Sequence, residues 1–204
     1  AARTARFRVG MVFQYPEHQL FEETVYEDIA FGPRNQGLSD ADVESRVREA
    51  MELVHLPERY RTRSPFALSG GERRRVAIAG VLALAPRYLV LDEPAAGLDP
   101  RGREELLAML TMLHRERGVS IVLVSHSMED ILRVANHMVI LADGQVIGEG
   151  VPHDLFQRDD LLARAALAAP HLLRLGRKLE AAGYPVRDCM TVADMSEKIL
   201  ASGR

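Results

Sequence analysis

The sequence has few of the features that mark a secreted, a membrane-spanning or a nucleic-acid-binding protein. It contains a single cysteine, Cys189, which excludes an internal disulfide framework and fits a reducing cytosol. No apolar stretch approaches the roughly 20 residues that a membrane-spanning helix needs, and no signal-peptide pattern opens the chain. Basic residues are dispersed and the net charge is −3, so a nucleic-acid-binding surface is not indicated. If the protein works at a membrane, we expect it to do so through a partner.

Arginines are the one local exception to this dispersed charge. They form a run at Arg73–Arg75 and a close pair at Arg61 and Arg63. Charged side chains are mostly exposed in folded proteins. We therefore interpret both groups as parts of a solvated face.

Strand and helix patterns alternate along the first two thirds of the chain. With 204 residues, 47% of them hydrophobic, the protein can form one sizeable core plus an appendage. Apolar runs predict strands at 7–13, 88–91 and 119–124, the last two buried and the strand at 88–91 covered on both faces. Capping residues and helical spacing predict helices that begin at Ser39, at Ser69 and near Arg101. The alternation predicts an α/β fold with a mostly parallel sheet, interrupted by a helical insert.

The last third of the sequence has a different pattern. After a short helix at 128–135, Asp143-Gly144 separates two short apolar runs and predicts a β-hairpin. From Pro152 onward the chain is rich in Ala and Leu and predicts helices, with a break at 183–185 and a last helix capped by Thr191. We expect a helical tail after the α/β core.

Two adjacent carboxylates, Asp92 and Glu93, end the apolar strand at 88–91. The carboxyl end of a parallel strand is the place where α/β proteins bind ligands. One carboxylate can hold Mg²⁺, directly or through water, because Mg²⁺ favours oxygen ligands. The next can orient or deprotonate an attacking water in phosphoryl transfer. An acidic pair that only caps a helix is the alternative, and the order of the motifs described below argues against it.

A second candidate element is the helix start at Ser69, Gly70, Gly71 and Glu72. Ser69 is the predicted cap and Glu72 stands at the third helical position, where it completes a capping box. The two glycines leave backbone N–H groups exposed at the positive end of the helix, which suits an anion. An ordinary capped helix would carry the same four residues, so this string alone does not identify a phosphate site.

Five motifs occur in one order, and together they resemble those of ATP-binding cassette (ABC) ATPases. They are Gln14 after a strand, LSGGE at 68–72, LVLDEP at 89–94, GLDP at 97–100 and Ser125-His126. The resemblance implies a P-loop NTPase-like (RecA-like) core with an ABC helical subdomain, and ATP and Mg²⁺ as cofactors. It implies that Glu93 assists the attacking water, that Asp92 and Gln14 manage Mg²⁺, and that His126 senses the γ-phosphate. Gln14, Glu93 and His126 are thus the candidate catalytic residues.

The same resemblance assigns two elements to a dimer of ATPase subunits. Ser69, Gly70, Gly71 and Glu72 would close over the γ-phosphate held by the opposite subunit. Asp99 would lie in the turn at the dimer seam, although it also has the sequence position of a helix cap before Pro100. Both roles of Asp99 are compatible.

The segment 13–33 (FQYPEHQLFEETVYEDIAFGP) resembles the second ATPase subunit of energy-coupling factor (ECF) transporters, which import vitamins or transition-metal ions. The resemblance implies a homo- or heterodimer with a second ABC ATPase, on the cytoplasmic face of the membrane as a peripheral subunit. A transmembrane scaffold protein, which binds near 14–31, and a substrate-binding membrane subunit would complete the complex, with no nucleic acid. It also implies two domains: an ATPase domain at 1–150, with its helical subdomain at about 17–86, and a helical extension for dimerisation at 151–204.

One family motif has no counterpart in the sequence. A phosphate-binding loop of the form G-x-x-x-x-G-K-[ST] needs a lysine after a glycine-rich turn, and the lysines here, Lys178 and Lys198, follow no such turn. We expect that the chain is an N-terminally truncated ABC domain, that it is a fragment with unpaired strand edges and marginal stability, and that alone it does not hydrolyse ATP. Two alternatives remain open: a non-catalytic module that supplies its signature motif in trans, and a soluble ABC protein unrelated to transport.

Overall fold

The computed structural model describes residues 7–186, 189 and 191–202. The chain divides into two compact units, Ala1–Val124 and Ser125–Arg204, and each is described here by itself. The predicted domain boundary after residue 150 lies inside the second unit. The predicted boundary separates an ATPase domain from a helical extension, whereas the two units are separated by compactness. The predicted boundary therefore stays a prediction.

The first unit is built on a three-stranded parallel sheet, as the sequence predicts. Its strands are β1 (Val9–Val12), β2 (Tyr88–Asp92) and β3 (Ser120–Val124), in the order β1-β2-β3. The central strand is β2, and both neighbours hydrogen-bond to it in parallel register.

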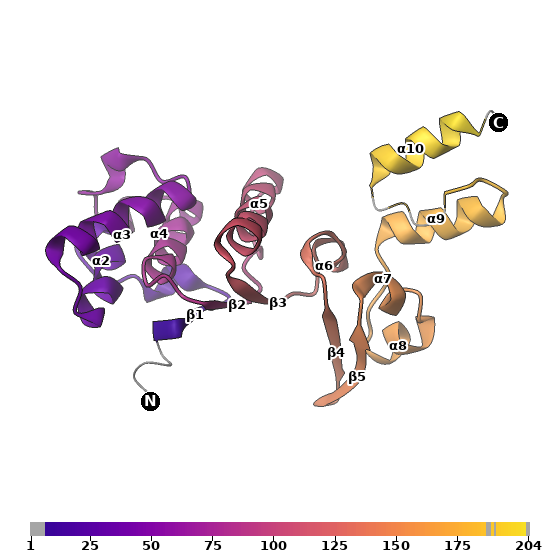
Figure 1. The fold of residues 1–204 in the computed structure, drawn as a ribbon, viewed down its shortest axis with the longest axis horizontal. Helices are drawn as coiled ribbons and strands as arrows, with labels where there is room; N and C mark the ends of the chain where they lie inside the picture. The colour runs from indigo at the N-terminus through magenta and orange to yellow at the C-terminus, as the bar shows by residue number, and fades with distance from the viewer. Residues whose placement is uncertain (1–6, 187–188, 190, 203–204) are drawn as a thin grey trace. The chain divides into compact units, whose positions relative to one another are not determined.

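Helices lie between these strands in the sequence and cover one face of the sheet (Figure 1). The helices α2, α3 and α4 pack against one another, α4 also packs on β1, and α5 packs on β3. Together they enclose one continuous apolar core. The bounds are η1 (Pro16–Gln19), α2 (Val25–Gln36), α3 (Asp40–Leu53), η2 (Glu58–Tyr60), η3 (Pro65–Ala67), α4 (Gly70–Leu82) and α5 (Pro100–Arg117).

Local sequence signals begin and end these helices where expected. The side chains of Ser39 and Ser69 each accept a hydrogen bond from the backbone N–H three residues later, which stabilises the starts of α3 and α4. Gly118 ends α5 in a left-handed conformation, with φ of 66°, that glycine adopts without steric cost. The predicted helix starts are confirmed.

Burial alternates along the strands, so one prediction about the sheet is wrong. Leu89 and Leu91 are fully buried, whereas Tyr88 is 43% exposed and Val122 on β3 is 55% exposed. The expectation that 88–91 is covered on both faces and that 119–124 is a buried strand rested on their unbroken apolar character. In the first unit the helices cover one face only, because α4 and α5 pack on the same side (Figure 1).

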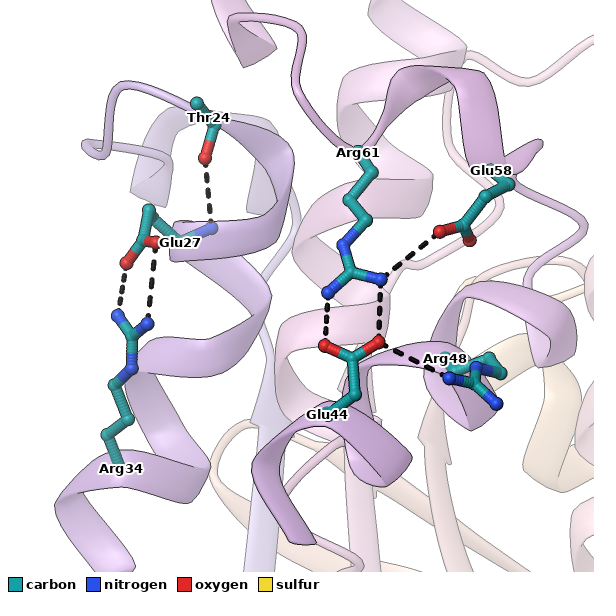
Figure 2. Close-up of polar contacts among 7 residues, drawn as sticks. All are labelled: Thr24, Glu27, Arg34, Glu44, Arg48, Glu58 and Arg61. Atoms are coloured by element: carbon teal, nitrogen blue, oxygen red, sulfur yellow. Dashed lines mark hydrogen bonds and ion pairs between the residues drawn. The ribbon is translucent and has the colours of Figure 1, made fainter. Parts of the chain in front are cut away.

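Arg61, which the sequence places on a solvated face, makes several contacts with other parts of the first unit. Figure 2 shows that Arg61 contacts Glu44 of α3 and Glu58 of η2, and that Glu44 also contacts Arg48. The guanidinium of Arg61 also lies 4.3 Å from the ring centroid of Tyr26. The carboxylate of Glu44 raises the pKa of Arg61 above its ordinary value. These contacts fasten the segment before α4 to α2 and α3.

The second unit contains a β-hairpin and several helices. The strands β4 (Met138–Ala142) and β5 (Gln145–Gly150) pair in antiparallel register around Asp143 and Gly144, whose φ angles are 50° and 73°. This confirms the predicted hairpin, since positive φ at both turn residues is typical of a two-residue connection. The helices are α6 (Met128–Val134), α7 (Pro152–Leu155), α8 (Asp159–Arg164), α9 (His171–Ala181) and α10 (Val192–Ala201).

A small core joins the last two helices of the second unit. It is formed by Val186, Cys189 and Met195, and burial raises the pKa of the Cys189 thiol. The predicted break near 183–185 lies between α9 and α10, and Thr191 caps α10 as expected. In the described part of the chain, no helix is long and apolar enough to cross a membrane.

Candidate functional site

Three of the predicted site residues lie at the carboxyl edge of the parallel sheet. Val12 of β1 stands opposite Leu91, and Asp92 stands opposite Val124 of β3. Gln14 follows β1 by two residues, and Glu93 follows β2 directly. Parallel strands place their carboxyl ends at one edge of a sheet. The structure thus brings Gln14, Asp92 and Glu93 to the same edge.

Glu93 has an unusual backbone conformation for a residue with a side chain. Its φ angle is 47°, in the left-handed region, and its N–H donates a hydrogen bond to the carbonyl oxygen of Val124 at 2.9 Å. Its own carbonyl oxygen accepts from the N–H of Ala96 at 3.1 Å, which closes a turn directly after the strand. Such a conformation costs about 1–3 kcal/mol and persists where the surroundings fix it, often at functional sites.

The carboxylates at this edge suit Mg²⁺ only as part of a larger ligand set. Asp92 and Gln14 are exposed and offer oxygen atoms. Among the described residues there is no group of three or more His, Cys, Asp or Glu side chains that could hold a metal ion. Mg²⁺ keeps several waters and binds through one or two carboxylates plus phosphates, so Asp92 and Gln14 stay candidate ligands only.

The start of α4 is a complete capping box, as predicted. The side chain of Ser69 accepts from the N–H of Glu72 at 3.4 Å, and the Glu72 carboxylate accepts from the N–H of Ser69 at 2.8 Å. The Tyr60 hydroxyl donates a further hydrogen bond to Glu72 at 2.7 Å. These bonds to Tyr60 and Ser69 lower the pKa of Glu72 to about 2. The carboxylate is therefore charged and committed to shaping the helix start.

Gly70 and Gly71 lie in open space. A Cβ atom added at either position would meet none of the described residues within 4 Å, and neither glycine has a positive φ. The two glycines leave the backbone N–H groups of the first turn accessible to whatever approaches from outside.

A cleft of about 620 Å³ in the first unit brings together two of the predicted elements. Ser69, Gly70 and Gly71 line it from α4, and Asp99 lines it from the turn before α5. Asp99 also caps α5, since its side chain accepts from the N–H of Gly102 at 2.7 Å. Asp99 therefore caps α5 and lines the cleft at the same time, and the sequence is compatible with both roles.

The remaining predicted site residue, His126, lies in the second unit. It follows β3 by two residues and precedes the cap of α6 at Ser127, whose side chain accepts from the N–H of Asp130 at 3.3 Å. Its assignment as a sensor of phosphate stays a prediction, as do the roles of the other candidate residues.

Arg74 is a residue whose importance the sequence reasoning missed. The run Arg73–Arg75 predicts a solvated face, but Arg74 is only 5% exposed. Its guanidinium contacts the Glu17 carboxylate and the carbonyl oxygens of Pro94 and Ala96. A signal was present in the sequence: Arg74 shares a helical stripe with Ile78, four residues later, and that stripe faces the core.

The fold and these motifs define the class of the protein as an ABC-type ATPase. A protein-family model described as "ABC transporter" matches residues 1–96. Among solved structures, cbiO1 from Clostridium perfringens, "part of the ABC transporter complex cbiONQ", has a TM-score of 0.69 and 34% identity, covering 86% of this chain and 68% of that one. The ATP-binding cassette MJ0796, a dimer bound to ADP and Pi, has a TM-score of 0.65 and 29% identity, covering 74% of this chain and 66% of that one.

Curated relatives narrow the family further. The energy-coupling factor transporter ATP-binding protein EcfA2 of Clostridium perfringens is 46% identical over 197 residues, which are 96% of this chain and 69% of the relative. The EcfA2 protein of Geobacillus kaustophilus is 50% identical over 196 residues, which are 95% of this chain and 68% of that relative. The chain belongs to the family of energy-coupling factor transporter ATP-binding proteins.

Proposed function

We propose that the full-length protein, in which a phosphate-binding loop accompanies the motifs of this chain, binds and hydrolyses ATP to energise an ECF-type membrane importer of vitamins or transition-metal ions. The observation that carries the proposal is the convergence of Gln14, Asp92 and Glu93 at one edge of a parallel sheet. Membership of the ECF ATP-binding family supports it. The same membership favours a transport ATPase over a soluble ABC protein unrelated to transport.

In this proposal Glu93 positions or deprotonates the attacking water, and Asp92 with Gln14 holds Mg²⁺ beside it. Mg²⁺ would supply charge neutralisation on the phosphate oxygens. The left-handed backbone at Glu93 and its hydrogen bond to Val124 hold the start of the side chain in one place. Such preorganisation is the protein's main contribution to phosphoryl transfer.

The helix start at Ser69–Glu72 binds a nucleotide other than the one at the Asp92-Glu93 edge of the same chain. Its two glycines face open space in this chain, and the cleft that it lines also includes Asp99 but neither Asp92 nor Glu93. We therefore assign Ser69, Gly70 and Gly71 to the triphosphate held by a second ATPase subunit, and Asp99 to the seam between the two subunits. Glu72 keeps the first turn of α4 in shape for that contact. His126 would contact the γ-phosphate.

The membrane scaffold would bind the surface formed by the segment 14–31. Phe21 and Phe31 are 58% and 46% exposed, and their rings meet edge to face with centroids 4.9 Å apart. The carboxylate of Asp28 accepts hydrogen bonds from the backbone N–H groups of Phe21 and Glu22, which fixes this loop on α2. A prearranged aromatic pair is the kind of anchor that protein interfaces favour. Through this contact the protein would lie on the cytoplasmic face of the membrane.

The experiment that tests the proposal is ATP hydrolysis and transport by the complete assembly. The full-length protein, with its phosphate-binding loop, would be purified with the second ATPase subunit and the membrane subunits and reconstituted into vesicles. We expect hydrolysis that stops when EDTA removes Mg²⁺, and uptake of a vitamin or a transition-metal ion that requires ATP on the side of the ATPases. An assembly that binds Mg·ATP but neither hydrolyses it nor transports any member of a vitamin and metal-ion panel would refute the proposal.

A further inference from the structure

Arg74 joins three segments that carry the proposed chemistry. It extends from α4, five residues after Ser69, and its side chain is 7% exposed. Its Nε and Nη2 atoms donate to the two carboxylate oxygens of Glu17 at 3.3 and 3.4 Å. Its Nη1 atom donates to the carbonyl oxygen of Pro94 at 3.4 Å and to that of Ala96. One guanidinium therefore contacts the segment after Gln14 and the turn after Glu93.

The arrangement uses the geometry of arginine rather than its charge alone. A guanidinium presents its N–H donors in a rigid planar fork, so it can hold a carboxylate with two donors and carbonyl oxygens with another. A lysine ammonium is a point charge on a flexible stem and cannot hold all three groups in one plane. The Glu17 carboxylate is also enclosed, with 15% of its side chain exposed. Burial would raise the pKa of Glu17, but its own backbone hydrogen bond and Arg74 outweigh that effect and lower it.

Stability alone gives little reason for such a pair. A buried ion pair is often no more stabilising than apolar side chains of the same volume, because both charges lose their hydration. The two carbonyl contacts, however, act on a specific turn. Ala96 closes the turn at Glu93 by donating its N–H to the Glu93 carbonyl oxygen at 3.1 Å. Arg74 donates a hydrogen bond to the carbonyl oxygen of Ala96, so both backbone groups of Ala96 are bonded.

We propose that Arg74 is a positioning residue for ATP hydrolysis, which fixes the turn at Pro94–Ala96 and thereby orients Glu93, and which ties that turn to Glu17 and to α4. Because α4 begins at Ser69, a displacement of the signature helix would be transmitted to Glu93 through this guanidinium. This inference rests on the proposed function, since it concerns the orientation of the same carboxylate. It adds a residue that lines the cleft beside Ser69 and Gly70, but whose guanidinium is bonded to Glu17 and to the turn after Glu93.

The test is the separation of turnover from nucleotide binding in the complete assembly. In Arg74→Gln we expect the hydrolysis rate per bound nucleotide to fall about 10- to 100-fold, the range for misplacing a catalytic group by about 1 Å or losing a group that supports it. The affinity for a fluorescent ATP analogue with Mg²⁺ should stay within about threefold, because Arg74 reaches no phosphate in this proposal. Rates are divided by the number of nucleotide-binding sites, so a merely less stable protein would show no change.

Three further variants separate the contacts. Arg74→Lys keeps the charge but not the fork, and we expect an intermediate loss of rate. Glu17→Gln keeps an oxygen acceptor for Arg74 and leaves the carbonyl contacts in place, so its loss should be smaller than that of either Arg74 variant. Arg48→Gln is the control, since Arg48 lies on α3 outside the cleft and its ion pair with Glu44, at 3.4 Å, does not contact the turn. Its rate should equal that of the unaltered protein.

Each failure has a distinct meaning. Wild-type turnover in Arg74→Gln would overturn the inference while the proposed function stood. An equal loss in Arg48→Gln would overturn it too, since the effect would then belong to the loss of any arginine ion pair on this unit. If Arg74→Gln does not fold, wild-type turnover in a folded Arg74→Lys is the result that overturns it. Absence of hydrolysis in the unaltered assembly would instead refute the proposed function.

Discussion

The backbone N–H of Glu93 donates a hydrogen bond to the carbonyl oxygen of Val124 at 2.9 Å, although Glu93 lies beyond the end of β2. The pairing between β2 and β3 thus continues by one residue, and Glu93 makes it with φ of 47°. A neighbouring strand and a tight turn together hold this residue in a left-handed conformation. These contacts fix the backbone of Glu93, from which its side chain extends. The first prediction depends on this.

Glu93→Gln in the complete assembly should reduce ATP hydrolysis by at least about 100-fold, the usual contribution of a general base. The amide keeps the size and the backbone strain, so the melting temperature and nucleotide-driven dimerisation should be unchanged. Hydrolysis is measured by phosphate release, and dimerisation by light scattering with Mg·ATP. Unchanged hydrolysis would remove Glu93 from its proposed role.

Glu93→Gly separates strain from chemistry at the same position. Glycine adopts positive φ without steric cost, so the variant should be more stable than the unaltered protein by about 1 kcal/mol. It should be as inactive as Glu93→Gln. Chemical denaturation of the two variants side by side measures the difference. A lower stability of Glu93→Gly would mean that the turn is not strained in the protein.

Gly71→Ala and Gly71→Asp test whether the start of α4 faces a phosphate of another subunit. A Cβ at Gly71 meets nothing within 4 Å, and alanine favours helix over glycine by about 1 kcal/mol. We expect both variants to fold, with Gly71→Ala at least as stable as the unaltered protein. Gly71→Asp should prevent ATP-driven dimer closure, because it adds a negative charge where the phosphate would lie. Closure that survives this change would refute the assignment.

Tyr60→Phe should lower stability at neutral pH by about 1 kcal/mol, the value of one hydrogen bond to a partly exposed carboxylate. The Tyr60 hydroxyl is the first cause of the low pKa of Glu72, which is about 2 against an ordinary value of 4.5. A lowered pKa in the folded state stabilises the protein above pH 4.5, and that contribution disappears as the pH falls through about 2. The difference between variant and unaltered protein should therefore be largest near pH 7 and narrow below pH 4.5. Denaturant titrations at pH 7 and pH 3 measure it, and a gap that widens in acid would contradict the expectation.

Phe21→Ala should weaken binding of the membrane scaffold while leaving the fold intact. Phe21 is 58% exposed and its ring contacts only the edge of another exposed ring, that of Phe31, in the described aromatic pairs. Loss of an interface anchor costs about 2 kcal/mol or more, a drop of about 30-fold in affinity. Co-purification with the membrane subunits measures the loss, and Phe66→Ala serves as a control on the same unit because Phe66 is 60% exposed outside the segment 14–31. Equal effects of both changes would argue against this docking surface.

The sequence determined the order of elements and most of their ends. Ser39, Ser69 and Gly118 begin or end helices through bonds to residues a few positions away, and such local interactions can be read from the sequence. The parallel sheet followed from strands separated by helices, and the approach of Gln14 to the Asp92-Glu93 edge followed from the sheet. These features depend on periodicity and local chemistry alone.

Only the tertiary structure decided the contacts between distant segments. The arginine run by itself did not distinguish the buried Arg74 from its half-buried neighbours, because Arg74 contacts Glu17 and Pro94, which lie 57 and 20 residues away in the chain. It also overestimated the burial of the sheet, since an unbroken apolar strand does not say how many of its faces a helix covers. Which charged side chains pair, and which faces of the sheet the helices cover, depend on packing in three dimensions. The order of residues along the chain does not give the distances between segments that are far apart in it.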